Sequence, residues 1–469
     1  MNDGYFALAA YAKTVREQIK LGNLELALGD VALRAEAIKN DPLAVARIFG
    51  SATLDLLCVE LGASVFEDVE SARGAHRIAA GAHAVYVCTE TLSSGGHTRV
   101  VSDLIRAAPE YTHHVVLTNL WERSQHFMQE FESLGAQITI LPKASILEKL
   151  RLLTTFLDGF ERARVFLLNH HQDSVAVAAV GANARHERFF IHHSDYLFCL
   201  GLFLPGVVHV DLHTMGFHDC RSTLKIDANI YWPLTCEDGN TMRSGDFFGD
   251  GGLVTCCCGS DHKFTGRYPI DYFDTVAAIL KTRSGKHIHI GSIEDQHKRR
   301  LLDTLTANGV ALDRFQHIAH VANLRTALLD LKVDAYMVSF PVGGGRAVIE
   351  AMSAGVPVVG HLHHHNNVLG GTDLLPKIAP VWSNVPELLA ILQSLDRDKL
   401  VALAAASRER YETFHHPSLL ARALAGDLLS PPPRRASDIE PMQVFLFEKT
   451  YLAPPPQKTF SLPGVSWRQ

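Results

Sequence analysis

The residues best suited to chemistry lie in the stretch "SFPVGGGRAVIEAMSAGVPVVGH", which spans residues 339–361. Three consecutive glycines, Gly343, Gly344 and Gly345, come where an apolar strand pattern meets a helical pattern. Arg346 and Glu350 follow them. A run of glycines costs backbone entropy on folding. We expect the close approach of a ligand to the backbone to offset this cost, so the stretch is predicted to be a binding loop.

A second candidate set ends a predicted strand in "FFIHHSDYLF", residues 189–198, and contains His192, His193 and Asp195. Ligands of open α/β sheets bind beyond the carboxyl ends of the strands. A histidine with a pKa near neutrality can take a proton from an attacking group, and a nearby carboxylate can orient its ring. This set is therefore predicted to supply a general base.

Other histidines follow later strands. The segment "VDLHTMGFHDCR" supplies Asp211, His213 and His218, and "HLHHHNN" spans residues 361–367. No HExxH or comparable ligand spacing is present. Cys256, Cys257 and Cys258 are adjacent on a predicted strand, so their side chains point to opposite faces. The sequence thus predicts a cleft-facing role for these histidines and no metal site.

Short apolar strands that alternate with helical patterns must position these residues. One series begins at residue 83 with "HAVYVC" and runs to "VVHVDLH", and a second begins at residue 253 with "LVTCCC" and runs to "VPVVGH". Such alternation predicts parallel sheets covered by helices on both faces. A polar, glycine-rich segment, residues 236–252, is the predicted boundary between the two.

The two ends of the chain have different patterns. Residues 1–80 are predicted to be helical, with one stretch over residues 5–38 and another over residues 42–62. The last forty residues contain "SPPPRR" and "APPPQK", which favour an extended tail. The predicted regions are therefore a helical region (1–80), a first α/β domain (81–240), a second α/β domain (250–425) and a proline-rich tail (430–469).

Composition narrows the class of protein. Apolar residues make up 47% and charged residues 20% of the chain, and the formal net charge is −6. With no long basic run, the sequence argues against a nucleic-acid partner. The amino terminus lacks the order of a signal peptide, and the most apolar segment is too short to span a bilayer. We expect a cytoplasmic globular protein with reduced thiols.

The order of elements and the short motifs together resemble the GT-B glycosyltransferases, which have two Rossmann-like domains facing a cleft. The stretch "DAYMVSFPVGGGRAVIEAMSAGVPVVG" is similar to their nucleotide-sugar signature. The resemblance implies that amides at a helix amino terminus bind the diphosphate. It also implies that Glu350 accepts hydrogen bonds from the ribose hydroxyls. Lys263, in "CCCGSDHKFTG", matches a cation that contacts the diphosphate.

The same resemblance gives a role to "SSGGHTRVV", residues 93–101. It is not a GxGxxG motif, so a nicotinamide site is not predicted. GT-B proteins often have a glycine pair in this loop, here Gly95 and Gly96, facing the donor across the cleft. His97 would then point into the cleft and is a further candidate base.

The stereochemistry of the transfer is predicted from a position where this sequence differs from the family pattern. Retaining members of the fold carry a glutamate eight positions before the ribose-binding one, and here that position is Val342. "FPVGGG" looks more like the inverting branch, which includes O-GlcNAc transferases and bacterial cytoplasmic protein glycosyltransferases. The resemblance thus implies a metal-independent, cofactor-free transfer from a nucleotide sugar, expected to be UDP-linked. The helical region at the amino terminus could enlarge a docking surface, so a protein acceptor is expected, and lipid-linked or saccharide acceptors stay open. A sugar-nucleotide epimerase and a non-catalytic nucleotide-sugar binding protein stay open as alternatives.

Overall fold

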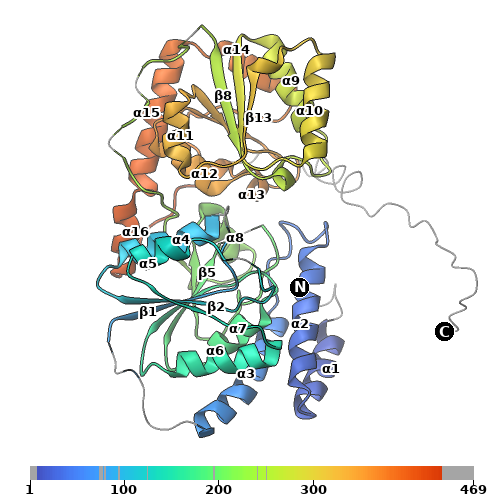
Figure 1. The fold of residues 1–469 in the computed structure, drawn as a ribbon, viewed down its shortest axis with the longest axis vertical. Coiled ribbons are helices and arrows are strands. Elements are labelled where there is room, and N and C mark those ends of the chain that lie inside the picture. Colours follow the sequence, from blue (N-terminus) through green and yellow to red (C-terminus); the bar gives the residue numbers. More distant parts are fainter. Residues whose placement is uncertain are drawn as a thin grey trace, which may run out of the picture.

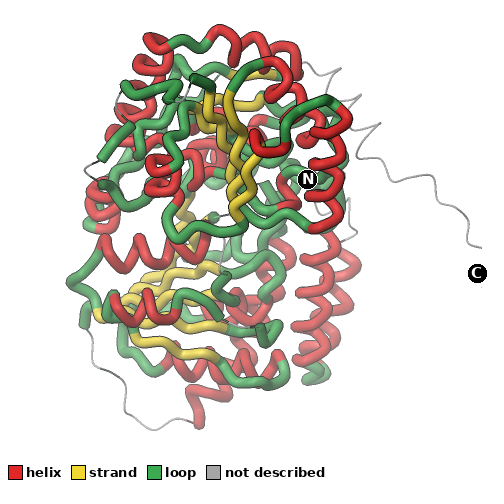
Figure 2. The backbone as a smooth tube through the Cα atoms, turned by 45° about the horizontal axis from the view of Figure 1, so that its top comes forward, coloured by secondary structure: helices red, strands yellow, loops and turns green. Residues whose placement is uncertain are grey.

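A computed structural model of the chain describes residues 8–72, 78, 81–92, 96–123, 125–193, 196–239, 241–243, 245–249 and 251–435. The chain forms two α/β domains, one above the other in Figure 1, and the amino-terminal helices lie beside the lower one. Figure 2 shows the two sheets as separate groups of strands. The predicted class, two Rossmann-like domains with an amino-terminal helical extension, is confirmed.

The first domain contains a parallel sheet of seven strands in the order β3-β2-β1-β4-β5-β6-β7. Side chains alternate along β1: Ala84, Tyr86 and Cys88 enter one core, and Val85 and Val87 enter the other. Both faces are therefore covered, as continuous apolar strands require. The strands are β1 (His83–Cys88), β2 (Thr112–Leu117), β3 (Gln137–Ile140), β4 (Arg164–Leu168), β5 (Glu187–His192), β6 (Val208–Asp211) and β7 (Ile230–Tyr231).

The helices of this domain are α4 (Gly96–Ala107), α5 (Met128–Ser133), α6 (Ile146–Asp158), α7 (Ser174–Ala182) and α8 (Thr214–Ser222). Residues of α4 join Tyr86 and Phe166 in one core, and residues of α6 and α7 join Val85 and Val165 in the other. Each face of the sheet thus has its own helical layer.

The second domain repeats this plan with a parallel sheet of six strands in the order β10-β9-β8-β11-β12-β13. The strands are β8 (Leu253–Cys258), β9 (Gly285–Ile290), β10 (Phe315–Ile318), β11 (Ala335–Met337), β12 (Val358–His361) and β13 (Val381–Trp382). The helices are α9 (Tyr272–Thr282), α10 (Asp295–Ala307), α11 (Leu324–Asp330), α12 (Gly345–Ser353), α13 (Asn367–Gly370), α14 (Val385–Ser394), α15 (Arg397–Phe414) and α16 (Pro417–Leu424), with short 3-10 turns η1 (Asp261–Lys263), η2 (Leu312–Arg314) and η3 (Thr372–Leu374).

The strand order reverses at one place in each sheet. In the first sheet this place is between β1 and β4, and in the second it is between β8 and β11. Loops that leave the carboxyl ends of such strands diverge and open a crevice for ligands. The loop after β8 carries Lys263, the loop after β11 carries the three glycines, and the loop after β1 leads to His97. The fold therefore places the candidate loops at the two switch points.

The amino-terminal helices form an additional layer on the first domain. They are α1 (Leu8–Lys20), α2 (Leu24–Lys39) and α3 (Ala52–Ala72). A Cβ added at Gly62 of α3 would lie 2.1 Å from the carbonyl oxygen of Ala178 in α7. Because that spacing leaves room only for glycine, α3 and α7 cross at close approach. The helical region therefore shares a core with the first domain.

The second predicted helical stretch, residues 42–62, was placed too early in the chain. Residues 42–47 form turns, residues 48–51 have no regular structure, and the helix spans Ala52–Ala72. Ala46 has a positive φ of 56°; its N–H donates to the carbonyl of Tyr196 at 2.7 Å, and its carbonyl accepts from the side-chain amide of Asn366 at 3.2 Å. These contacts with both domains replace the helical hydrogen bonds that the local apolar pattern favours.

The carboxyl-terminal part of the described chain returns to the first domain. Helix α16 packs on α4, beside the lower domain in Figure 1. Beyond it, Thr214 of α8 donates to the carbonyl of Pro432 at 2.5 Å, and Arg434 lies between Asp219 and Asp373. The first residues of the predicted tail thus cross from one domain to the other, and residues 436–469 lie outside the described residues.

We predict that Asp55→Ala destabilises the joint between α3 and the first domain. The buried Asp55 carboxylate accepts from the backbone N–H groups of Gly201 and Phe203, each at 2.7 Å. Each N–H left unpaired should cost about 1–3 kcal/mol. Thermal and urea unfolding measure the loss. Asp68→Ala, at an exposed position of the same helix, is the control and should have little effect; equal stability of the two variants would contradict the prediction.

Candidate functional site

The glycine loop leads directly into α12, which begins at Gly345 with Gly344 as its N-cap residue. No side chain caps this end, and its first turn holds no acidic residue. The positive end of the helix dipole and the first backbone N–H groups are therefore available to an anion. The loop that the sequence predicts to bind a ligand thus leads into an uncapped helix end, and the binding role stays a prediction.

Each glycine of the loop lies close to a different neighbour. A Cβ on Gly343 would come within 3.0 Å of the carbonyl oxygens of Leu369 and Gly370, and one on Gly344 would lie 2.9 Å from the Lys263 ammonium. A Cβ on Gly345 would lie 2.9 Å from Nε2 of His213, which belongs to the first domain. The loop is therefore packed between both domains, and larger residues would displace these neighbours.

Lys263 is the cation of this loop. It ends η1, after β8, and its ammonium donates to the carbonyl of Gly343 at 3.4 Å. Burial lowers the pKa of Lys263, and Cys258 opposes the shift. A partly desolvated ammonium beside an uncapped helix end gains strongly from an anionic ligand. The structure thus brings together Lys263 and the three glycines, and their role in binding a diphosphate stays a prediction.

Arg346 and Glu350 form an ion-paired group on α12. Nε of Arg346 donates to Glu350 at 3.0 Å, and its terminal nitrogens donate to the carboxylate of Asp103 on α4. Burial opposes the charge, but the two carboxylates raise the pKa of Arg346 and keep it protonated. Asp103 was not foreseen from the sequence, because only the docking of the two domains brings it to Arg346.

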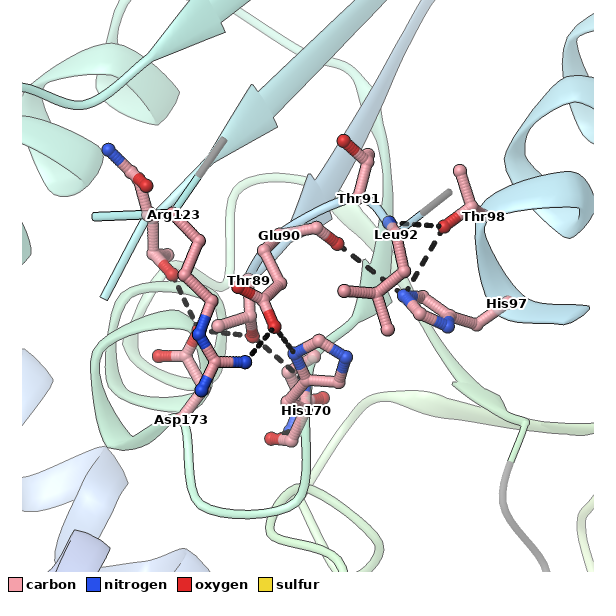
Figure 3. A network of polar contacts seen from close by, with 12 residues as sticks. Thr89, Glu90, Thr91, Leu92, His97, Thr98, Arg123, His170 and Asp173 are labelled. Atoms are coloured by element: carbon pink, nitrogen blue, oxygen red, sulfur yellow. Dashed lines mark hydrogen bonds and ion pairs between the residues drawn. The ribbon is translucent and has the colours of Figure 1, made fainter. Parts of the chain in front are cut away.

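The first domain places a cluster of histidines at the carboxyl ends of β1, β4 and β5. His97 stacks on His193 with ring centres 5.5 Å apart and meets His170 edge-on at 4.9 Å. Nε2 of His97 donates to the carbonyl of Glu90 at 3.4 Å, as Figure 3 shows. A Cβ on Gly96, the preceding residue, would lie 3.8 Å from Cβ of Arg346. This cluster therefore adjoins the glycine loop of the second domain.

Burial keeps these rings neutral. It lowers the pKa of His97, lowers that of His193 well below its usual value and lowers that of His170 to about 3, and neighbouring histidines add to the last two shifts. A neutral imidazole has a lone pair that can accept a proton. The cluster therefore has the protonation state of a general base, at a position where two domains meet.

Glu90 is a candidate that sequence reasoning missed. Its carboxylate is only 4% exposed, and it lies 3.3 Å from Arg123 and 3.9 Å from Nδ1 of His170. Burial raises the pKa of Glu90, and Arg123 opposes this shift. In Figure 3 its side chain points between Arg123 and His170. Its position directly after β1, at a switch point, was the signal available in the sequence.

The buried carboxylate of Asp173 holds the strand ends that carry Glu90 and His170. Asp173 accepts from the hydroxyls of Thr89 at 2.6 Å and Thr118 at 2.7 Å, and it caps α7 through the N–H of Ala176. Thr89 in turn accepts from the N–H of His170 at 2.8 Å. These bonds join the ends of β1, β2 and β4, so Glu90 and His170 are held on rigid elements (Figure 3).

His192 lies apart from that cluster. Its side chain is 2% exposed, and its Nδ1 is 2.8 Å from Asp211 on the neighbouring strand β6. The carboxylate predicted to orient it, Asp195, lies outside the described residues, as does Gly95. The base role of His192 stays a prediction, and its burial favours His97 and His193 instead.

The histidines of residues 361–365 form an aromatic group with Tyr268 and Trp382. The Tyr268 hydroxyl is 2.6 Å from Nε2 of His361 and accepts from the N–H of His364 at 3.0 Å. The rings of His361 and Trp382 lie 4.2 Å apart. The rings of these histidines are therefore packed against one another and against Tyr268 and Trp382 at the end of β12. Burial lowers the pKa of His361 to about 3.

Comparison with solved structures supports the assignment of the fold. A glycosyltransferase from Rickettsia africae is 12% identical with a TM-score of 0.57, covering 74% of this chain and 97% of its own. Anabaena HepE in complex with UDP and glucose is 12% identical with a TM-score of 0.54, covering 74% and 98%. A mutant O-GlcNAc transferase from Thermobaculum terrenum is 14% identical with a TM-score of 0.51, covering 89% and 82%. The chain therefore has the GT-B fold of these glycosyltransferases.

Neither a protein-family model nor a curated relative matches the sequence. Within the described residues, no helix has the length and apolar character needed to cross a membrane. All eight cysteines lie within the described residues, none of them is in a disulfide, and seven are buried.

We predict that Arg346→Ala lowers the stability of the domain junction. The change leaves the carboxylates of Asp103 and Glu350, 7% and 20% exposed, without their shared cation. Breaking a buried pair in this way costs about 3–5 kcal/mol. Thermal unfolding of Arg346→Ala, Asp103→Ala and the double variant isolates their coupling.

The control is Arg300→Ala, which breaks the exposed pair with Asp271 and should cost less than about 1 kcal/mol. Coupling near zero between Asp103 and Arg346 would show that the two domains are not joined through this pair.

Proposed function

We propose that the protein is a glycosyltransferase that moves a sugar from a UDP-linked donor to an acceptor, with inversion at the anomeric carbon. One observation carries the proposal: the Lys263 ammonium lies against the glycine loop at the uncapped start of α12. A lysine and a helix amino terminus together match a diphosphate. The presence of UDP and glucose in the complex of Anabaena HepE, which shares the fold, supports UDP as the nucleotide.

The donor domain would hold the leaving group. The α12 amides and Lys263 bind the two phosphates, and Glu350 accepts hydrogen bonds from the ribose hydroxyls while Arg346 orients it. When the bond to the sugar breaks, negative charge grows on the diphosphate. Groups already aimed at that charge stabilise the transition state most, because they need no reorganisation. This set of residues gives a transfer in which the protein itself neutralises the diphosphate.

The first domain would supply the base. We assign it to His97, because Gly96 beside it adjoins Arg346 and because its lowered pKa keeps the ring neutral. The Nε2–H of His97 donates to the carbonyl of Glu90, so Nδ1 carries the lone pair that takes the acceptor proton. Glu90 and His193 are the alternative bases in the same cluster.

Inversion follows from a single displacement. The acceptor attacks opposite the diphosphate and its proton passes to the base. Val342, where retaining relatives have an acid, offers no carboxylate; its N–H donates to the carbonyl of Lys263 and its carbonyl accepts from Ser339. Val342 therefore acts as a backbone spacer that holds the loop against Lys263.

A protein acceptor in the cytoplasm fits the remaining features. Helices α1–α3 enlarge the first domain on its outer layer. The similarity to an O-GlcNAc transferase extends over a larger share of this chain than the other two similarities do. A saccharide acceptor is the other outcome of the test below.

The direct test measures UDP release from a panel of UDP-sugars, with and without an acceptor-containing cell extract. Transfer requires the extract and labels a protein or a saccharide in it. An acceptor-independent product would identify an epimerase, and binding without turnover would identify a sugar-nucleotide binding protein. Either result would refute the proposed transfer.

We predict that Lys263→Ala weakens UDP binding. Loss of a charge-assisted hydrogen bond of about 1.5–3 kcal/mol corresponds to a Kd about 10–150-fold higher. Calorimetry with UDP measures it. Lys281→Ala on the exposed part of α9 is the control for loss of one positive charge, and equal affinity of the two variants would remove Lys263 from the site.

We predict that His97→Ala lowers turnover by about 10²–10⁴-fold and leaves UDP affinity nearly unchanged. Glu90→Gln and His193→Ala, assayed in parallel, should be less affected; a larger loss in either would move the base to that residue. NMR of the product linkage tests the stereochemistry, and a β product from an α-linked donor is expected. An α product would refute inversion.

A further inference from the structure

We propose that His192, His209, Asp211 and Cys220 form a binding site for a tetrahedral divalent metal, with zinc as the best match. The four side chains are between 0% and 5% exposed. One nitrogen, oxygen or sulfur atom from each lies within 4.8 Å of the others. This site is separate from the glycine loop and does not depend on the proposed transfer.

The sheet register explains why these residues meet. His209 and Asp211 are two apart on β6, so their side chains share one face. His192 on β5 pairs with Asp211, which places it on the same face of the neighbouring strand. Helix α8 follows β6 and brings Cys220 onto that face. Four ligand types thus converge from three successive elements.

The spacing of the ligand atoms matches a tetrahedral site. Asp211 Oδ1 lies 2.8 Å from Nδ1 of His192 and 3.1 Å from Nε2 of His209. Cys220 Sγ lies 3.4 Å from His209, 3.4 Å from Asp211 and 3.6 Å from His192. Zinc bonds of about 2.0–2.3 Å at tetrahedral angles put ligand atoms about 3.3–3.6 Å apart. A small outward shift of the two histidines completes this geometry.

Both ring nitrogens of His209 face an oxygen atom. Its Nδ1 is 3.4 Å from the carbonyl oxygen of Leu202, which can only accept a hydrogen bond. Its Nε2 faces the carboxylate oxygen of Asp211 at 3.1 Å. A metal ion bound by Nε2 and that oxygen would leave Nδ1 to donate to Leu202.

His209 and Asp211, two of the four proposed ligands, have the hydrogen-bond partners that support metal ligands. A ligating histidine usually donates its other N–H to a carbonyl, and a ligating carboxylate is itself hydrogen-bonded. His209 does the first with Leu202. Oδ2 of Asp211 accepts from Asn229 at 2.6 Å, and Arg221 holds Asn229 through a bond of 2.6 Å to its side-chain oxygen.

The ligand chemistry points to a structural zinc. Two imidazoles, one carboxylate and one thiolate are nitrogen, oxygen and sulfur donors that zinc accepts, and four protein ligands leave no open position. The carboxylate and thiolate neutralise the ion, which makes its burial favourable. The metal would join β5, β6 and α8, and so would hold His213 at the start of α8 beside Gly345.

Metal content and a cobalt spectrum of the full, untagged chain test the site. We expect one zinc per chain by mass spectrometry, removed by a strong chelator with a lower thermal midpoint. Cobalt added to the zinc-free chain should give the visible bands of a tetrahedral ion and a thiolate charge-transfer band.

Cys220→Ala should lose the charge-transfer band and the effect of the chelator on the thermal midpoint. Cys58→Ala, at another buried cysteine in α3, is the control and should keep both. A wild-type chain that holds no zinc and gives no thiolate–cobalt band would overturn the proposal. These readouts do not involve UDP or sugar transfer, so they are independent of the proposed function.

Discussion

The contact of Arg346 with Asp103 and Glu350 is a buried ion-paired group that joins the two domains at the candidate site. Arg346 is the second residue of α12, directly after the glycine loop, and Asp103 lies on α4, which follows the loop after β1. One buried guanidinium therefore joins the helices that follow both candidate loops. Burying these charges costs free energy unless each of them keeps its hydrogen-bond or ion-pair partner. The geometry of the ion pair therefore restricts how the two domains can face each other.

The two domains contribute different electrostatics to the site between them. The second domain offers Lys263 and a helix amino terminus, both favourable to an anion. The first domain offers His97, His170 and His193, which burial keeps neutral. The proposed transfer from a nucleotide diphosphate would require a cation for the leaving group on one side and an uncharged proton acceptor on the other.

The fold divides the histidines into two groups, although some of them are neighbours in the sequence. His192 and His193 are adjacent, yet the ring of His193 joins His97, whereas His192 faces Asp211, His209 and Cys220. The strand alternation sends neighbouring side chains to opposite faces. His209 stood out in no motif, because its role depends on the pairing of β5 with β6 and on the position of α8.

The sequence by itself determined the two alternating α/β series and the glycine loop at the start of α12, because each depends on periodicity and on residues close together in the chain. Only the tertiary structure decided that residues 42–51 are not helical, that Asp103 pairs with Arg346, and that Glu90 lies among the histidines. Those features depend on contacts between residues far apart in the chain. A buried polar group must form a hydrogen bond with whatever partner the fold brings to it. The free energy of that bond then exceeds the local preference for a helix or a strand.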